Sequence, residues 1–155
     1  MADFANVPQQ AIAIIAPSNL YLSIDPILSL QDCKDAMLNA SAPIIAVTPI
    51  IGGEAVKGPA AKLMRELGEE PSAAVVAEHY ADFINGFVLD VRDAHLKQQI
   101  EDMGMGVLVT DTLMNDDDDR ARLACEVVNF ADTLRPEKLG GCTIEPSQIP
   151  PAAAL

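Results

Sequence analysis

The sequence has no tryptophan, few aromatic residues and few basic ones. Aromatic side chains make up 4% of its 155 residues, so the chain offers no stacking platform for single-stranded nucleic acid. Ten lysines and arginines face 23 aspartates and glutamates, for a formal net charge of −13. A field of that sign repels a phosphate backbone, so we expect no nucleic-acid partner. An anionic ligand would need local help from backbone N–H groups, a lysine or a divalent metal.

Long apolar runs and paired cysteines are also missing. No apolar run reaches the roughly 18 residues that cross a bilayer, and residues 1–4 lack the basic start of a signal peptide. The three cysteines, Cys33, Cys125 and Cys142, are isolated and odd in number. That pattern argues against a disulfide framework and against a zinc site. We therefore expect reduced thiols, no membrane partner and a cytoplasmic protein.

Half of the residues are hydrophobic and the mean hydropathy is +0.19, which excludes a disordered chain. The length fits one ordinary domain. We divide the chain into an N-terminal extension (1–10), an α/β domain (11–135) and a tail rich in proline and alanine (136–155). Because the tail has little to bury, we expect it to be disordered or to act as a docking arm.

Short apolar runs alternate with helical patterns. The runs are apolar on successive residues, which is typical of parallel strands covered on both faces. They occupy residues 11–16, 43–48, 86–90 and 106–110. Helical patterns occupy residues 31–40, 59–68, 72–83, 92–103 and 116–134. This order predicts an α/β fold with a doubly wound, mostly parallel sheet and helices on both faces.

In such sheets a ligand lies beyond the carboxyl ends of the strands, which selects three loops. The first contains Ser18 and Asn19, whose side chains and neighbouring amides can hold a phosphate or nucleotide. An ordinary Asx or Ser turn is the alternative.

The second loop, 48–59, contains Gly52, Gly53, Lys57 and Gly58. Its glycines permit close backbone approach, and its lysine precedes a helix start. It matches neither a Walker A loop nor GxGxxG, and a flexible connector is the alternative.

The third loop, 110–114, contains Thr110 as a further phosphate contact and Asp111 as a possible ligand of Mg²⁺. A turn aspartate is the alternative there.

The other acidic residues and the histidines are expected to have structural roles and no catalytic or metal-binding role. The run Asp116 to Asp119 lacks calcium-loop spacing and is typical of a solvated helix start. His79 and His95 have no partner pattern, and no G-x-S-x-G elbow is present.

Taken together, these segments resemble the C-terminal half of the 2-phospho-L-lactate transferase family, over about residues 11–133. Several motifs in the right order carry the resemblance. They are Ala16-Pro17-Ser18-Asn19, Ser23-Ile24-Asp25-Pro26-Ile27-Leu28, the stretch from Ala42-Pro43 through Pro49-Ile50-Ile51-Gly52-Gly53, Lys57-Gly58-Pro59-Ala60, Tyr80-Ala81-Asp82, Gly86-Phe87-Val88-Leu89-Asp90 and Val109-Thr110-Asp111-Thr112-Leu113-Met114.

The resemblance implies a role in making the deazaflavin coenzyme F-420. A phospholactyl group, or phosphoenolpyruvyl in some bacterial members, passes from a GDP-linked donor to 7,8-didemethyl-8-hydroxy-5-deazariboflavin. GMP leaves and Mg²⁺ assists. Ser18, Asn19 and Lys57 would then serve the donor's phosphates or nucleotide, and Asp111 the metal or a hydroxyl. The family also suggests a homodimer.

The sequence departs from the family in ways that bear on activity. Ala16 and Leu20 replace a glycine and a proline of the first loop, and Asp25 stands where a glycine is usual. Residues 1–10 cannot supply the family's glycine-rich N-terminal half, so the fold is incomplete relative to the family. We expect the chain to be inactive alone unless it associates with a second polypeptide carrying that half.

Two alternatives stay open. The first is a non-catalytic, nucleotide-sugar-binding regulator of the gluconeogenesis-factor-like family, which shares the fold and the first loop. The second is a non-catalytic remnant without affinity for guanine nucleotides. Residues 57–59 and 110–114 look closer to the transferases.

Overall fold

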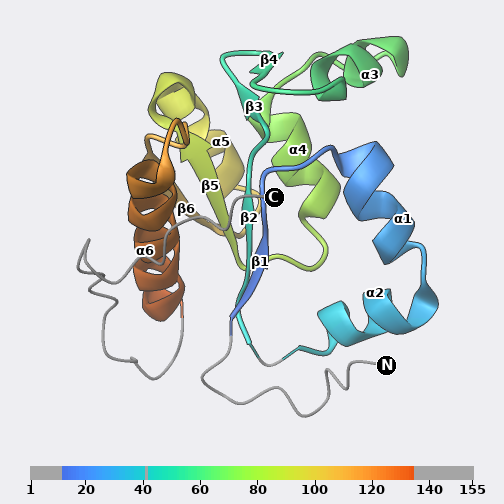
Figure 1. The fold of residues 1–155 in the computed structure, drawn as a ribbon. Coiled ribbons are helices and arrows are strands. Elements are labelled where there is room, and N and C mark those ends of the chain that lie inside the picture. The colour runs from blue at the N-terminus through green and yellow to red at the C-terminus, as the bar shows by residue number, and fades with distance from the viewer. Residues whose placement is uncertain (1–11, 41, 135–155) are drawn as a thin grey trace, which may run out of the picture.

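A computed structural model describes residues 12–40 and 42–134. The expectations for residues 1–10, for Cys142 and for the tail lie outside these ranges. The described chain forms a four-stranded sheet in the order β1-β2-β5-β6, in which all three pairings are parallel (Figure 1). The strands are β1 (Ala13–Ile15), β2 (Ile44–Val47), β5 (Gly86–Asp90) and β6 (Gly106–Thr110). The predicted α/β fold with a mostly parallel sheet is confirmed.

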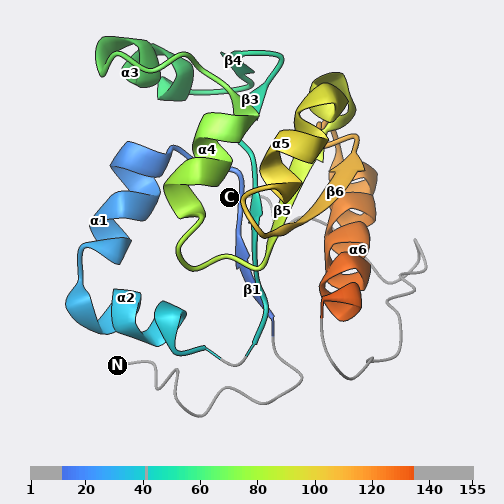
Figure 2. The same ribbon diagram turned by 180° about the vertical axis from the view of Figure 1, so that it is seen from behind.

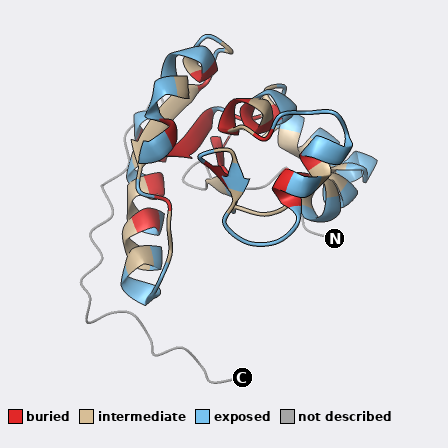
Figure 3. Cartoon of the chain, turned by 90° about the horizontal axis from the view of Figure 1, so that it is seen from above, coloured by how far each residue is buried: buried red, intermediate tan, exposed pale blue. Residues whose placement is uncertain are grey.

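Alternate residues of β2, β5 and β6 belong to two separate cores. Phe87 and Leu89 of β5 join the larger core, while Val88 joins a smaller core. The larger core also includes residues of α3 (Ala60–Glu66), α4 (Ala73–Tyr80) and α5 (Lys97–Glu101), and the smaller one includes residues of α6 (Asp117–Thr133). Figure 2 shows α4 and α5 in front of the sheet, whereas α6 stands on the other side. Because both faces are covered, every residue of β2 and β5 is buried, as Figure 3 shows for the central strands. That burial is why these strands are apolar on successive residues.

The helices follow the predicted pattern with shorter ends. They are α2 (Gln31–Leu38), α3 (Ala60–Glu66), α4 (Ala73–Tyr80) and α6 (Asp117–Thr133). Ser72 caps α4 by accepting the N–H of Ala74 (3.1 Å), and Asp116 caps α6 by accepting that of Asp119 (2.9 Å). None of the helices in the described ranges has the length and apolar character needed to cross a membrane.

The single helix expected over residues 92–103 is wrong. The segment divides into a 3₁₀ helix, η3 (Val91–Leu96), and a short helix, α5 (Lys97–Glu101). Asp90 accepts the N–H of Arg92, only two residues along the chain, and Asp93 is drawn into the protein by a bond to another loop. These two contacts favour a tight first turn over a regular α-helix.

Two further elements lack a strong sequence pattern and were not predicted. A turn of π-helix, η2 (Leu20–Ile24), runs into α1 (Asp25–Leu28) after the first strand. A two-stranded antiparallel hairpin, β3 (Ile50–Ile51) and β4 (Glu54–Ala55), follows β2. In Figure 1 this hairpin stands above the carboxyl ends of the sheet strands.

Glycines let α6 approach the sheet closely. Gly86 and Gly106 face each other on β5 and β6. A Cβ on Gly86 would lie 2.7 Å from Leu134 Cδ1, and one on Gly106 would lie 2.6 Å from Leu134 Cδ2. The glycine pair therefore makes room for the end of α6, where Phe130 and Leu134 pack against the smaller core.

Candidate functional site

The three predicted loops meet at the carboxyl edge of the sheet and enclose a cavity of about 150 Å³. The lining residues are Pro17, Ser18, Asn19, Thr48, Pro49, Ile51, Val56, Lys57, Thr112, Leu113 and Met114. Segments that lie up to about a hundred residues apart thus form one site, as the sequence predicts. We refer to this cavity, with the residues just given, as the rim pocket. Its volume is below the roughly 300–1,000 Å³ usual for a whole ligand, so it suits one part of a larger ligand.

In the first loop, Asn19 caps η2. Its Oδ1 accepts the N–H of Leu22 (3.0 Å), which is the Asx-type turn that we considered as the alternative. Its Nδ2, however, is buried and has no hydrogen-bond partner among the described residues. A buried amide donor left unpaired costs about 1–3 kcal/mol. Asn19 is thus a structural cap that also lines the rim pocket beside Ser18 and carries a buried, unused donor.

Residues 50–55 of the second loop form a two-stranded hairpin. Gly52 and Gly53 form its two-residue turn with φ of 58° and 78°, a conformation that favours glycine at both positions. The N–H of Gly52 donates to Asp93 Oδ2 (2.9 Å), and Arg65 donates to Glu54 (2.6 Å). The glycine pair therefore shapes the turn, and neither glycine lines the rim pocket.

Lys57 follows the hairpin and does line the rim pocket. It is exposed, and none of the ion pairs within the described ranges involves it. Gly58 next to it has φ of 76° and bends the chain toward α3, but it lies outside the lining. Lys57 is thus a cation available to an anionic ligand.

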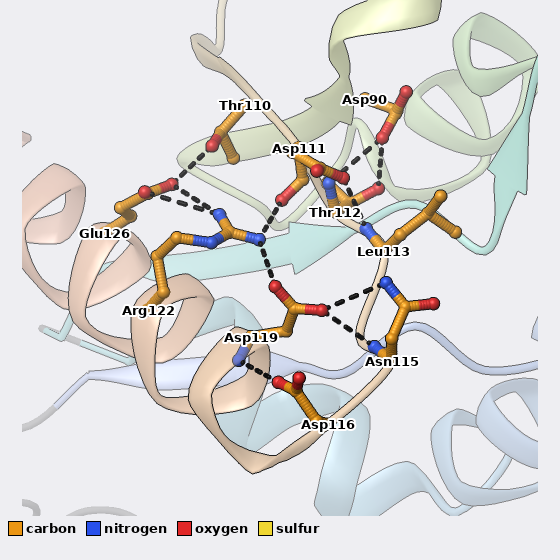
Figure 4. Close-up of polar contacts among 10 residues, drawn as sticks. All are labelled: Asp90, Thr110, Asp111, Thr112, Leu113, Asn115, Asp116, Asp119, Arg122 and Glu126. Carbon is orange, nitrogen blue, oxygen red and sulfur yellow. Dashed lines mark hydrogen bonds and ion pairs between the residues drawn. The ribbon is translucent and has the colours of Figure 1, made fainter. Parts of the chain in front are cut away.

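The third loop contributes residues other than the predicted ones. Thr112, Leu113 and Met114 line the rim pocket, whereas Thr110 and Asp111 do not. Thr110 Oγ1 donates to Glu126 of α6, as Figure 4 shows. Thr110 therefore faces away from the pocket.

Asp111 is exposed and closes a turn: its Oδ1 accepts the N–H of Leu113 (3.0 Å), and its backbone carbonyl accepts from Arg122 Nη2 (2.9 Å). This is the turn role that we considered as the alternative. No group of three or more potential metal ligands exists among the residues that the structure describes. The role of Asp111 as a magnesium ligand stays a prediction.

The loop after β6 is held from both sides (Figure 4). On the α6 side, Asp119 Oδ2 accepts from both the backbone N–H and the side-chain amide of Asn115, each at 3.0 Å. These bonds, with Arg122 nearby, hold the pKa of Asp119 below its ordinary value. The acidic run at 116–119 is thus the start of α6, as predicted, and not a calcium loop.

Three buried polar residues at this edge escaped sequence reasoning. Asp90 Oδ2 accepts from both the N–H and the hydroxyl of Thr112, at 3.0 and 3.1 Å. Asp93 holds Gly52, as described above. Thr48 Oγ1 accepts the N–H of Ile50 (3.1 Å) and so turns the chain out of β2. The sequence signal for Thr48 and Asp90 is a polar residue placed directly at the end of a buried strand, whereas Asp93 lies three residues further on and has no such signal.

The two histidines, His79 and His95, lie outside the rim pocket. His79 Nε2 lies 2.7 Å from Asp25 Oδ1, away from the rim pocket. His95 is exposed on η3. Neither histidine lines the rim pocket, so the described site contains no histidine.

Comparison with known proteins places these features in context. The family model described as 2-phospho-L-lactate transferase CofD matches residues 5–130. The chain is 42% identical to the 2-phospho-L-lactate transferase of Methanosarcina barkeri, over 78% of this chain and 38% of that protein. It is 37% identical to the one of Methanocaldococcus jannaschii (79% and 38%) and 30% identical to the phosphoenolpyruvate transferase of Streptomyces griseus (80% and 39%). The chain thus spans about two fifths of the length of these relatives.

Proposed function

Because this chain belongs to the 2-phospho-L-lactate transferase CofD family, we propose that it takes part in moving a phospholactyl or phosphoenolpyruvyl group. The donor is GDP-linked, and the acceptor is the ribityl hydroxyl of 7,8-didemethyl-8-hydroxy-5-deazariboflavin. In this reaction the hydroxyl oxygen bonds to the phosphorus of the transferred group. The bond from that phosphorus to GMP breaks, and the hydroxyl proton is released. The setting that we propose is coenzyme F-420 synthesis in the cytoplasm.

The observation that carries the proposal is that one cavity is lined both by Asn19, whose buried amide donor has no partner among the described residues, and by an available cation, Lys57. Both favour an anion with oxygen acceptors, and a diphosphate has several. The cavity of about 150 Å³ suits that diphosphate. The guanosine and the deazaflavin would then lie outside it.

Magnesium fits this site as an ion carried by the substrate. Mg²⁺ is usually held by one or two carboxylates together with substrate phosphates and waters, so a cluster of protein ligands is not required. We propose Asp111 as its protein contact, since the residue is exposed on a loop that lines the rim pocket. When bound, the ion would neutralise charge on the diphosphate.

In this proposal the site is completed by further protein surface beyond the rim pocket. The rim pocket holds only part of the donor. In addition, apolar side chains face solvent: Ile14 of β1 is 43% exposed on the face that α6 covers elsewhere. We propose association with a second copy or with a chain that carries the remaining part of the family's fold. Light scattering after size-exclusion chromatography tests this, and a monomer that transfers the group by itself would contradict it.

The binding experiment is calorimetry of the 155-residue chain with GDP and Mg²⁺. We expect GDP to bind and guanosine not to bind, because the pocket is proposed for the diphosphate. Lys57→Gln should weaken GDP binding about tenfold or more, since a charge-assisted hydrogen bond contributes about 1.5–3 kcal/mol. The matched control is Lys62→Gln, because Lys62 is an exposed lysine of α3 that pairs with Glu66 (3.7 Å).

Two results would overturn the proposal. Absence of GDP binding at millimolar concentration would favour the non-catalytic remnant, and unchanged binding in Lys57→Gln would exclude the rim pocket as the site. The names of the relatives favour a transferase over a gluconeogenesis-factor-like regulator. Tighter binding of a nucleotide sugar than of GDP would instead favour the gluconeogenesis-factor-like regulator over the transferase.

A further inference from the structure

Two carboxylates lie inside the protein at the corner where β5 passes into η3. Asp90, the last residue of β5, is 1% exposed, and Asp93 in the first turn of η3 is 4% exposed. Burial of a carboxylate is costly unless hydrogen bonds compensate for the lost water. Neither residue lines the rim pocket, so neither is a candidate for direct contact with a ligand.

Asp90 holds the third loop from its inner side. Its Oδ2 accepts two hydrogen bonds from Thr112, at 3.0 Å from the backbone N–H and 3.1 Å from the hydroxyl (Figure 4). Its Oδ1 accepts the N–H of Arg92 (3.0 Å). The nearest cation, Arg92 Nε, lies 3.9 Å away, so the carboxylate is balanced mainly by N–H and O–H donors. Thr112 itself lines the rim pocket.

Asp93 holds the hairpin that carries the second loop. Its Oδ2 accepts the N–H of Gly52 at 2.9 Å, across 41 residues of sequence. Gly52 lies at the tip of the β3–β4 turn, and Ile51, directly before it, lines the rim pocket. Two aspartates three residues apart therefore reach two different loops, one on each side of the corner.

We propose that Asp90 and Asp93 are positioning residues that hold two of the three walls of the rim pocket in their binding geometry. The inference rests on the proposed function, because the geometry of these walls affects binding only if the rim pocket takes a ligand. Backbone and side-chain donors act on a phosphate only when they are held in place before the ligand arrives. Bonds from the end of β5 and the first turn of η3 supply that restraint to two loops at once.

The alternative is that both aspartates only stabilise the fold. The two roles differ in what the protein loses locally. A purely structural carboxylate affects the stability of the whole domain, whereas a positioning carboxylate affects the loop that it holds and the affinity of the site. Amide hydrogen exchange measured residue by residue separates these effects.

Asp93→Ala and Asp93→Asn form the decisive pair. Alanine removes the acceptor for Gly52, so we expect the Gly52 amide to exchange at least tenfold faster while the amides of β5 keep their rates. GDP affinity in the presence of Mg²⁺ should fall about tenfold. Asparagine keeps one acceptor oxygen and should restore both measurements, because Gly52 needs only one bond. Asp102→Asn on the exposed end of α5 is the matched control.

Asp90→Asn should behave differently from Asp93→Asn. Asp90 uses both oxygens, whereas an asparagine offers one oxygen and turns an NH₂ group toward a donor. We expect faster exchange at Thr112 and weaker GDP binding, with Gly52 unchanged. Thermal unfolding verifies that each variant is folded at the temperature of the measurement.

The outcomes decide the proposal separately from the function. An unchanged Gly52 amide in Asp93→Ala would overturn it, and so would a faster amide with unchanged GDP affinity. Uniform loss of protection across β5 would assign the residues to stability alone. Should the unmodified chain fail to bind GDP, the proposed function fails, and the exchange rates at Gly52 and Thr112 by themselves decide whether the aspartates hold the walls.

Discussion

Replacement of Asn19 by serine separates the two roles of this side chain. Its Oδ1 caps η2 by accepting the N–H of Leu22 (3.0 Å), while its Nδ2 is buried and finds no partner in residues 12–40 and 42–134. Serine caps a helix about as well as asparagine, so Asn19→Ser keeps the cap. It removes the amide N–H group that we propose as a hydrogen-bond donor to the phosphates of the GDP-linked substrate. The substitution therefore changes the proposed ligand contact and leaves the local fold in place.

We expect Asn19→Ser to lower the affinity for GDP without lowering the free energy of unfolding. Loss of a hydrogen bond to a charged group costs about 1.5–3 kcal/mol, which is roughly 10- to 150-fold in affinity for GDP. Stability should stay equal or rise, because an unpaired buried donor costs about 1–3 kcal/mol in the free protein. Asn19→Ala is the comparison: it should lose similar affinity and also about 1 kcal/mol of stability, since it loses the cap.

Calorimetry with GDP and Mg²⁺, together with urea unfolding of the same three proteins, measures both quantities. We expect GDP affinity to be highest in the unmodified chain and similar in the two variants. Stability should be lowest in Asn19→Ala. Equal GDP affinity in Asn19→Ser and the unmodified chain would refute the reasoning, because the orphan donor would then have no part in binding. A serine variant as unstable as the alanine variant would show that the cap depends on more than the acceptor.

Three further predictions concern stability. Gly86→Ala should lower the free energy of unfolding by about 1–3 kcal/mol, because its Cβ would lie 2.7 Å from Phe130 Cε1; urea unfolding measures this, and an unchanged midpoint would contradict the close packing. Ser72→Ala should cost about 1 kcal/mol through loss of the α4 cap, seen as a lower melting temperature, whereas Ser72→Asp should not. The hydrogen bonds from Asn115 lower the pKa of Asp119 from 3.8, so its contribution is present above pH 4 and is lost as the pH falls through the folded-state pKa. Carboxyl NMR titration should show a pKa below 3.8, and Asn115→Ala should return it only part of the way, because alanine removes the side-chain donor and keeps the backbone N–H.

Much of the fold is readable from the sequence because it depends on local patterns. The buried strands at 44–47 and 86–90 carry uninterrupted apolar residues, and both were expected. Ser72 and Asp116 mark helix starts because their side chains bond to N–H groups two or three residues away. Such short-range bonds leave a signal that can be read without knowledge of the fold.

Contacts between distant segments leave no such signal. Asp93 meets a glycine 41 residues away and Asp90 meets Thr112, 22 residues along. Nothing near either aspartate identifies its partner. For the same reason the order Thr110-Asp111-Thr112 did not reveal which threonine faces the pocket. Strand alternation alone would place Thr110 and Thr112 on the same face. However, β6 ends at Thr110, so Thr110 turns toward Glu126 of α6 while Thr112 turns toward Asp90.

The sequence by itself determined the class of fold, the edge of the sheet where a ligand would lie and the three loops that reach it. These follow from hydrophobic periodicity and from the rule that parallel strands end at one edge. Only the tertiary structure decided which side chains line the rim pocket, which glycines shape a turn and which buried carboxylates hold the loops. Those assignments depend on the relative position of segments far apart in the chain, and packing of the two cores fixes that position.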